Sequence, residues 1–509
     1  MVRTPLRKFA FWAGGLALFC GLVLYYIFFY SYAFPVNSDN MYFIHAAEDV
    51  LAGNVLLKGW NGGFFGALTG DILWAAGLRL FLSQKAVLYL IGPLSYALIV
   101  LFSWLILSAL PTESSGWIRG VLLLAIVFVP AALRHNMLTV GMHGIAIATI
   151  LILTWLAARL DQQKGIAHAK WLSAAYALLL WGGCLADGFV LYYFALPAIL
   201  VLIIELLRGR RILRGLLGLT ILAAAGGILT DKLISRFGFL QTVPTSFSLI
   251  SFSDLPHYLQ NSFRTWFLMF GFDPAADLSA IAVLRGMAGL VVMALTISAA
   301  LRYFKQPFSI RILLFCCLLN AGSFTLTGVT NGEPAVRYLS PAFFAATIVA
   351  AAQILSWRPE KRHFAWAAAL LLGVFGLSNL SLSWHSAPVS NQAYVEIADA
   401  LKDRGITRLY ATYWETHALS YYSGEKFISA PITVADGRIV PYQWSSKADW
   451  YQPAFEADCV LVSQNKRYGI TEALLVEQFG EFQHHLAYLG TDLYFYDKNL
   501  SALITESGD

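Results

Sequence analysis

Eleven long apolar stretches, separated by more polar connections, constrain this chain more than any other feature of its sequence. Each is close to the length of about 20 residues that an α-helix needs to cross the hydrocarbon core of a membrane. Hydrophobic residues make up 58% of the 509 residues and charged residues only 13%, a composition that excludes an ordinary soluble domain. The sequence therefore predicts a polytopic α-helical membrane protein with about 11 spans. The predicted spans are Phe9–Tyr30, Ala86–Leu110, Arg119–Leu133, Thr139–Ala158, Trp171–Leu185, Phe189–Leu207, Leu213–Leu229, Ile281–Ala300, Ile312–Gly328, Leu339–Leu355 and Phe364–Leu382.

The distribution of basic residues predicts how these spans are oriented. Arg3, Arg7 and Lys8 precede the first span, and further Lys and Arg residues occupy alternate connections, which should face the cytoplasm. This alternation works only if Phe65–Leu82, a twelfth apolar stretch, does not cross the membrane. We expect it to be an interfacial or re-entrant segment on the outer side. The basic charge thus reflects orientation, and no nucleic-acid partner is expected.

The chain changes character after Trp384, where a polar and acidic tail begins. Its periodicities and its glycine punctuation predict a small α/β soluble domain over residues 385–509, after a membrane domain over residues 1–384. With eleven spans this tail lies outside. Helices are predicted at Tyr394–Asp403, Trp414–Tyr422 and Thr471–Phe479, and strands at Arg408–Ala411, Cys459–Ser463, Leu486–Leu489 and Leu493–Tyr496.

Polar residues collect at the predicted outer ends of the spans. Asp39 emerges directly after the first span, where an acidic group at the membrane surface costs energy unless it has a use. A site built from such groups would face the outside at the depth of the lipid headgroups. The candidates are Asp39, His45, Glu48, Asp49, Arg134, His135, His143, Asp187, Glu333 and Arg337.

Three segments carry a resemblance to a known family. The loop SDNMYFIHAAEDVLAGN, residues 38–54, resembles the first outer loop of the GT-C superfamily of integral-membrane glycosyltransferases. The stretch NGEPAVRYLSPAFFAATIVAA, residues 331–351, resembles the late RY-x-x-P motif of that superfamily, which adds Tyr338 to the candidates. The tail from Tyr394 to Pro431 is similar to the α/β module attached to many bacterial members. The first loop has no Asp-x-Asp pair and the tail no WWDYG-type motif, which speaks against the oligosaccharyltransferase branch.

The resemblance implies a GT-C-like enzyme of the bacterial inner membrane, with its tail in the periplasm. Such an enzyme moves a sugar from a polyprenyl-phosphate donor to an envelope glycan or lipid, with inversion. The chemistry agrees, because nucleotide sugars are absent outside the cytoplasm. The acceptor hydroxyl needs a carboxylate base, and Asp39 matches the family's catalytic acid. The departing phosphate needs positive charge or a metal, and Arg337 supplies such a charge.

Each assignment has a structural alternative. Asp39 could be the N-cap of the following helix, and Arg337 could be an interfacial residue that extends to the headgroups. Glu48 and Asp49 could be metal ligands or a solvated helix face, so a divalent cation is left open. His143 could form a helix–helix hydrogen bond.

Asp187 could be a turn residue. The remaining candidates are interpreted as substrate contacts: His45, Arg134, His135, Glu333 and Tyr338.

Two other functional classes stay open at this point. A secondary transporter or lipid flippase would show inverted repeats and charges near mid-membrane, whereas the charges here lie at the ends of the spans. A non-catalytic scaffold of an envelope-assembly complex would use the tail to bind partner proteins.

Overall fold

The computed structural model contains all 509 residues. It describes residues 3–63, 68–110, 116–163, 169–242, 248–273, 275–330, 335–358, 360, 362–424, 427–465, 467–488 and 490–504, without the side chains of residues 3–12 and 329. Contacts divide the chain into two compact units. The first, here the helical unit, comprises Met1–Ser31, Tyr89–Thr230 and Ser246–Ser386. The second, here the sheet unit, comprises Tyr32–Leu88, Asp231–Thr245 and Ala387–Asp509.

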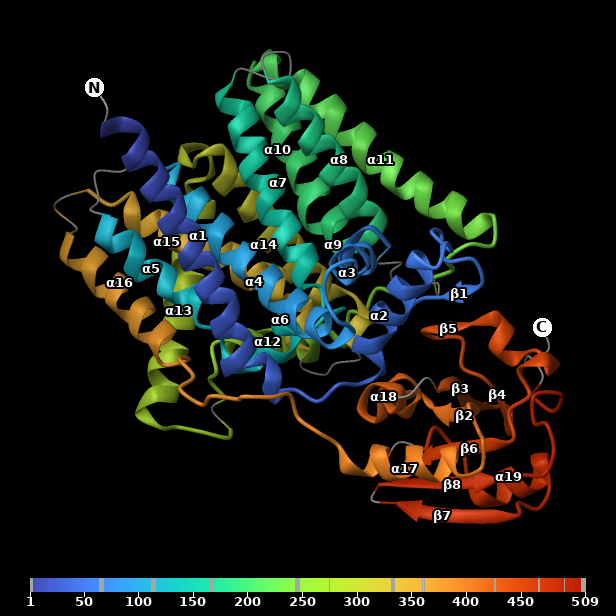
Figure 1. The fold of residues 1–509 in the computed structure, drawn as a ribbon. Coiled ribbons are helices and arrows are strands. Elements are labelled where there is room, and N and C mark those ends of the chain that lie inside the picture. Colours follow the sequence, from blue (N-terminus) through green and yellow to red (C-terminus); the bar gives the residue numbers. More distant parts are fainter. Residues whose placement is uncertain are drawn as a thin grey trace. The chain divides into compact units, whose positions relative to one another are not determined.

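Long apolar helices build the helical unit (Figure 1). Eight described segments are long and apolar enough to cross a membrane, so the predicted polytopic α-helical fold is confirmed. In chain order they lie on α1 (Arg3–Phe29), α4 (Gln84–Ser108), α7 (Gly144–Gln162), α9 to α10 (Gly188–Leu207), α11 (Arg214–Arg236), α13 (Ala280–Leu301), α14 (Phe308–Leu326) and α15 (Val336–Leu355).

The three other predicted spans also lie on helices, with shorter or bent geometry. The predicted span Arg119–Leu133 is not one straight helix. Helix α5 (Gly116–Val127) and the pair η3–α6 (Ala131–Leu138) are bent by 53°. Pro130 lies at the break, where it disfavours helical conformation in the residue before it. Helix α8 (Lys170–Ala186) covers the predicted span Trp171–Leu185, and α16 (Arg362–Leu377) covers the predicted span Phe364–Leu382 only as far as Leu377.

Helix α15 forms the centre of the helical unit, and every residue from Leu339 to Leu355 is buried. Small residues, mostly alanine, recur along it and permit close approach of neighbouring helices, as is common in membranes. Pro341 stands inside this helix. It has no backbone N–H to donate to the Arg337 carbonyl, and its ring clashes with that same carbonyl.

Two side chains satisfy the backbone groups around Pro341. The amide of Asn320, on α14, donates to the Tyr338 carbonyl at 2.8 Å and accepts from the Ala342 nitrogen at 2.9 Å. The Ser340 hydroxyl donates to the Arg337 carbonyl at 2.7 Å. The first turn of α15, which carries Arg337 and Tyr338, is therefore held by α14 and by its own serine.

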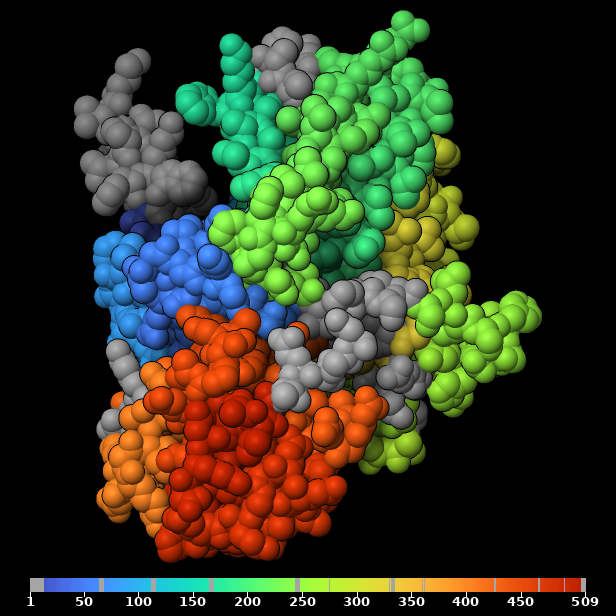
Figure 2. Space-filling model, turned by 90° about the vertical axis from the view of Figure 1, so that its right-hand side faces the viewer, coloured from blue at the N-terminus to red at the C-terminus, as the bar shows by residue number. Residues whose placement is uncertain are grey.

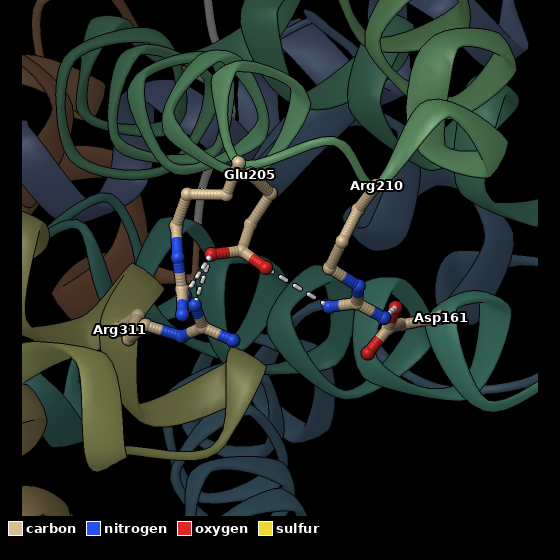
Figure 3. A network of polar contacts seen from close by, with 5 residues as sticks. Asp161, Glu205, Arg210 and Arg311 are labelled. Carbon is tan, nitrogen blue, oxygen red and sulfur yellow. Dashed lines mark hydrogen bonds and ion pairs between the residues drawn. The ribbon is translucent and has the colours of Figure 1, made fainter.

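An ion-pair network joins the ends of three helices (Figure 3). Glu205, at the end of α10, is 1% exposed, and it binds Arg208 and Arg210 at 3.1 Å each. It also binds Arg311 of α14, and Arg210 reaches Asp161 of α7 at 2.6 Å. A buried carboxylate is stable only when paired, so Glu205 ties α10 to the neighbouring helices.

A six-stranded mixed sheet organises the sheet unit (Figure 1), with strand order β4-β3-β2-β6-β8-β7. Side chains alternate between its two faces: Tyr410 and Val460 join one apolar core, whereas Leu409 and Leu461 join the other. The strands are β2 (Arg408–Thr412), β3 (Ile428–Ala435), β4 (Arg438–Pro441), β6 (Cys459–Ser463), β7 (His484–Tyr488) and β8 (Thr491–Phe495), with helices α17 (Gln392–Lys402), α18 (Tyr413–Ser423) and α19 (Glu472–Phe479).

The predicted tail elements are confirmed within one or two residues, but the hairpin β3–β4 was not predicted. Asp436 and Gly437, with φ of 50° and 73°, form its turn. An Asp-Gly pair between two short runs that contain β-branched residues is a strong hairpin signal, so the sequence contained the information.

The first segment of the sheet unit packs against the tail (Figure 2). Its elements are α2 (Ser38–Leu51), β1 (Trp60–Asn61), η2 (Leu68–Ile72) and α3 (Leu73–Arg79). Strand β1 pairs antiparallel with β5 (Ser446–Lys447) of the tail. The helices η2 and α3 cover twelve residues at about 1.5 Å each, too few to cross a membrane. The described part of Phe65–Leu82 therefore agrees with a segment that does not cross.

Candidate functional site

Asp39 lies in the first turn of α2, and it is not the N-cap. Asn37 caps this helix, because its side chain accepts from the Asn40 nitrogen at 3.1 Å. The structural alternative for Asp39 was therefore wrong by two residues. The half-buried Asp39 carboxylate instead accepts a hydrogen bond from the Tyr413 hydroxyl of the tail.

Tyr413 begins α18 and is buried. Burial and the nearby Asp39 raise the pKa of Tyr413 well above its usual value, so its hydroxyl remains a donor at any ordinary pH. The Ser38 hydroxyl lies 2.5 Å from the Tyr413 carbonyl and 3.0 Å from the Thr416 hydroxyl. These bonds fix the start of α2 on α18. An ionised carboxylate held in this way can accept a proton from a hydroxyl group.

His45, one of the predicted substrate contacts, pairs with His417 of α18. Their Nδ1 atoms are 3.0 Å apart, and His417 Nε2 lies 2.8 Å from the Ser445 carbonyl. A carbonyl only accepts, so His417 carries its proton on Nε2 and accepts on Nδ1. His45 must then donate from Nδ1. Burial lowers the pKa of His45 to about 4; burial and then the adjacent His45 lower that of His417 to about 3.

The two predicted metal ligands are both paired with cations. Glu48 binds Arg79 at 3.1 Å, and Asp49 binds Lys447 at 2.9 Å. Burial opposes ionisation of Asp49, but hydrogen bonds from Lys447, Trp60 and an asparagine outweigh it and lower its pKa. Within the described ranges, no three His, Cys, Asp or Glu side chains gather in a way that could hold a metal ion. A metal role for Glu48 and Asp49 stays a prediction.

A second cluster, in the helical unit, brings together four predicted residues. His143 Nδ1 lies 2.6 Å from an Asp187 carboxylate oxygen, and its ring stacks on Phe189 at 4.1 Å. The ring of Tyr338 lies 6.4 Å from that of His143. Arg337 lies over the ring of Tyr338 and donates to its hydroxyl at 2.7 Å.

His143 and Asp187 both have structural roles of the kind proposed as alternatives to function. His143 makes the predicted hydrogen bond between helices. Asp187 caps the short helix α9 (Gly188–Val190) by accepting from the Phe189 nitrogen at 2.9 Å. An imidazole oriented by a carboxylate at one nitrogen can also present its other nitrogen to a substrate, so these roles do not exclude function.

Arg134 binds backbone and an aromatic ring. It donates to the carbonyls of Val129 and Asn379 at 3.3 and 2.8 Å and lies 4.7 Å from the centre of the Tyr30 ring. His135 is its neighbour in α6 (Arg134–Leu138), and its carbonyl accepts from the Thr139 hydroxyl. The predicted candidate Glu333 lies outside the described residues.

Sequence reasoning missed the tail residues that meet α2. Tyr413, His417 and Lys447 lie more than 370 residues from their partners. No local sequence pattern identifies these residues, because what distinguishes them is their contact with α2, which only the folded chain brings about.

Comparison with known proteins finds likeness in structure and none in sequence. No protein-family model matches the chain, and no curated protein matches it by sequence. ArnT from Cupriavidus metallidurans in the apo state is 11% identical, with a TM-score of 0.56 over 97% of this chain and 99% of that one. The same protein bound to undecaprenyl phosphate gives 0.55 at the same identity and coverage. The archaeal oligosaccharyltransferase AglB from Archaeoglobus fulgidus, in complex with an inhibitory peptide and a dolichol-phosphate, gives 0.45 at 13% identity, over 95% of this chain and 74% of that one.

The likeness to ArnT covers both the membrane helices and the tail, so it concerns the whole architecture. The resemblance seen in the sequence is confirmed at the level of fold. This multi-pass membrane protein therefore shares its fold, over nearly its whole length, with ArnT from Cupriavidus metallidurans.

Proposed function

We propose that this chain is a membrane glycosyltransferase that transfers a sugar from a polyprenyl-phosphate donor to an envelope glycan or lipid. One observation carries the proposal. The fold is shared over 97% of the chain with a protein that was solved bound to undecaprenyl phosphate. Transfer takes place at the periplasmic face of the inner membrane, where the sugar must arrive on a lipid.

Asp39 is the general base in this proposal. The acceptor oxygen attacks the anomeric carbon, the bond from that carbon to the phosphate oxygen breaks, and the configuration inverts. Asp39 takes the hydroxyl proton, and the bonding electrons leave with the polyprenyl phosphate. The contact with Tyr413 supports this role, because a hydrogen bond to the ionised form favours it.

Arg337 binds the phosphate of the donor. A planar guanidinium binds phosphate oxygens in a bidentate manner, and no carboxylate pairs with Arg337 among the described residues. Its partner Tyr338 and the pair of His143 and Asp187 are the substrate contacts beside it. Arg134 and His135 are assigned to the same donor or acceptor contacts.

The proposal is tested with the purified full chain and a polyprenyl-phosphate sugar. Release of free polyprenyl phosphate, dependent on the sugar-linked lipid, is expected from the enzyme and from neither a transporter nor a scaffold. Asp39→Asn should lower turnover by about a hundredfold or more with folding unchanged, since Asn37 provides the cap. Asp399→Asn, an exposed acid of α17, is the matched control. If Asp39→Asn stays within a few-fold of the parent, Asp39 is not the base.

The phosphate role of Arg337 has its own test. Arg337→Lys keeps the charge and loses the planar fork, so the KM for the donor should rise by about tenfold or more. Normal donor kinetics in this variant would contradict phosphate binding.

A further inference from the structure

A row of aromatic side chains of the tail begins beside Tyr413, the residue that donates to Asp39. The ring of Tyr442 lies 5.5 Å from that of Tyr413 and 5.8 Å from that of Tyr468. The rings of Tyr442 and Trp444 lie 6.4 Å apart and only 17° from parallel. Tyr442, Trp444 and Tyr468, here the aromatic platform, are all partly buried, with some of their surface exposed.

The backbone of the platform is fixed. The Tyr442 nitrogen donates to the Pro431 carbonyl at 2.9 Å, and the Tyr442 carbonyl accepts from the Trp444 nitrogen at 2.7 Å. Ser445 and Tyr468 have φ of 52°, which is uncommon for residues with a side chain. Such conformations persist only where the surroundings enforce them. The Trp444 ring packs against Gly63, and all three residues keep part of their surface exposed.

We infer that the aromatic platform binds a pyranose ring of the acceptor, so that the acceptor is a saccharide. The inference rests on the proposed function, because a base that takes the acceptor's proton must lie beside the acceptor. The negative face of an aromatic ring attracts the C–H groups on one face of a sugar. Its hydroxyls need polar partners, and Asp39 offers a carboxylate there. A purely apolar ligand would leave that carboxylate desolvated.

Two titratable groups besides Tyr413 interact with Asp39. Both Tyr442 and Tyr468 have pKa values raised by burial and by neighbours that include Asp39. All three hydroxyls therefore stay protonated at neutral pH. No described residue hydrogen-bonds the Tyr442 hydroxyl, which leaves a polar group at the rim of the platform for a sugar.

Binding is tested on the full chain in a phosphocholine detergent, since a maltoside would compete. The probes are the methyl pyranosides of glucose, galactose and N-acetylglucosamine, observed by saturation-transfer NMR. Tyr442→Ala and Trp444→Ala should weaken binding by about tenfold, the value of one lost stacking contact. Tyr442→Phe keeps the ring and should keep binding. Tyr488→Ala, a half-exposed tyrosine on β7 at the opposite edge of the sheet, is the matched control.

Binding needs no turnover, so the inference and the proposed function fail separately. Absence of saturation transfer to every pyranoside, or equal transfer in folded Trp444→Ala, overturns the platform while donor-lipid release persists. The thermal midpoint of each variant shows whether it folds. In the transfer assay, Trp444→Ala should raise the KM for a saccharide acceptor and leave that of the donor unchanged. A raised donor KM alone would mean that the donor sugar occupies the platform, and would overturn the assignment to the acceptor.

Discussion

The repair of the Pro341 break by Asn320 makes a quantitative prediction. Asn320 is fully buried, and its amide replaces the bond that would join the Ala342 nitrogen to the Tyr338 carbonyl. Asn320→Ala leaves both groups unsatisfied. A buried unpaired group costs about 1–3 kcal/mol, although hydrogen bonds between membrane helices average about 0.6 kcal/mol. We therefore expect a loss of about 2 kcal/mol in the free energy of unfolding.

The same substitution should cost much less in a Pro341→Ala background. Alanine restores the backbone donor at 341 and lets the helix close its own hydrogen bonds, so the amide of Asn320 is no longer needed. The measurement is a double-mutant cycle by unfolding in mixed micelles, with an expected coupling energy of at least about 1 kcal/mol. Thr347→Ala is the control, since its buried hydroxyl donates to the Phe343 carbonyl of its own helix and has no further hydrogen bond among the described residues. Equal costs of Asn320→Ala in both backgrounds would refute the reasoning.

Three further predictions concern stability. Glu205→Gln leaves the buried Arg311 without its counter-charge and should cost about 3–5 kcal/mol by the same unfolding assay; a loss below 1 kcal/mol would contradict the network. In Gly376→Ala, the new Cβ would lie 2.1 Å from a carbonyl oxygen of α5, so the thermal midpoint should fall sharply. Gly322→Ala is the control, because its new Cβ would have no neighbouring atom within 4 Å among the described residues and should cause no such clash. The pKa values of His45 and His417 are lower in the folded chain than the ordinary value of about 6.5. The unfolded chain therefore binds more protons at acidic pH. The stability they contribute is therefore complete above about pH 6.5 and declines as the pH falls toward 4, which urea titrations at several pH values would measure; a flat profile in that range would be evidence against the buried pair.

Local pattern was enough to predict most of the long apolar helices, the three tail helices and four of the eight described strands. The stretch that forms α17 repeats apolar residues at helical spacing and caps with an asparagine, and β6 is a short β-branched run. Each of these signals is contained within a short continuous stretch of the chain, so it can be read from a single sequence. The hairpin β3–β4 was missed for a different reason. Its Asp-Gly turn is present in the sequence but was not interpreted as a hairpin signal.

The candidate site was predictable only in part. Asp39, Arg337, His143 and Asp187 were identified as polar residues at predicted span ends, and Tyr338 through the resemblance to the RY-x-x-P motif. Their partners depend on how distant segments pack, which periodicity does not encode. The acids of α2 could therefore be predicted from the sequence, whereas the tail residues that contact them, such as Tyr413 and Lys447, could not.

The sheet unit has a consequence for how the protein is made. Asp39 and Tyr413 are separated by 374 positions, and ribosomes add about 5–20 residues per second. Roughly 20–75 s pass between the synthesis of the two halves of this contact. During that interval helix α2 has been made but has no tail to pack against. A chain released early would carry its membrane helices and its acidic loop without the contact that holds Asp39, so the order of synthesis delays this contact until the last quarter of the chain has emerged.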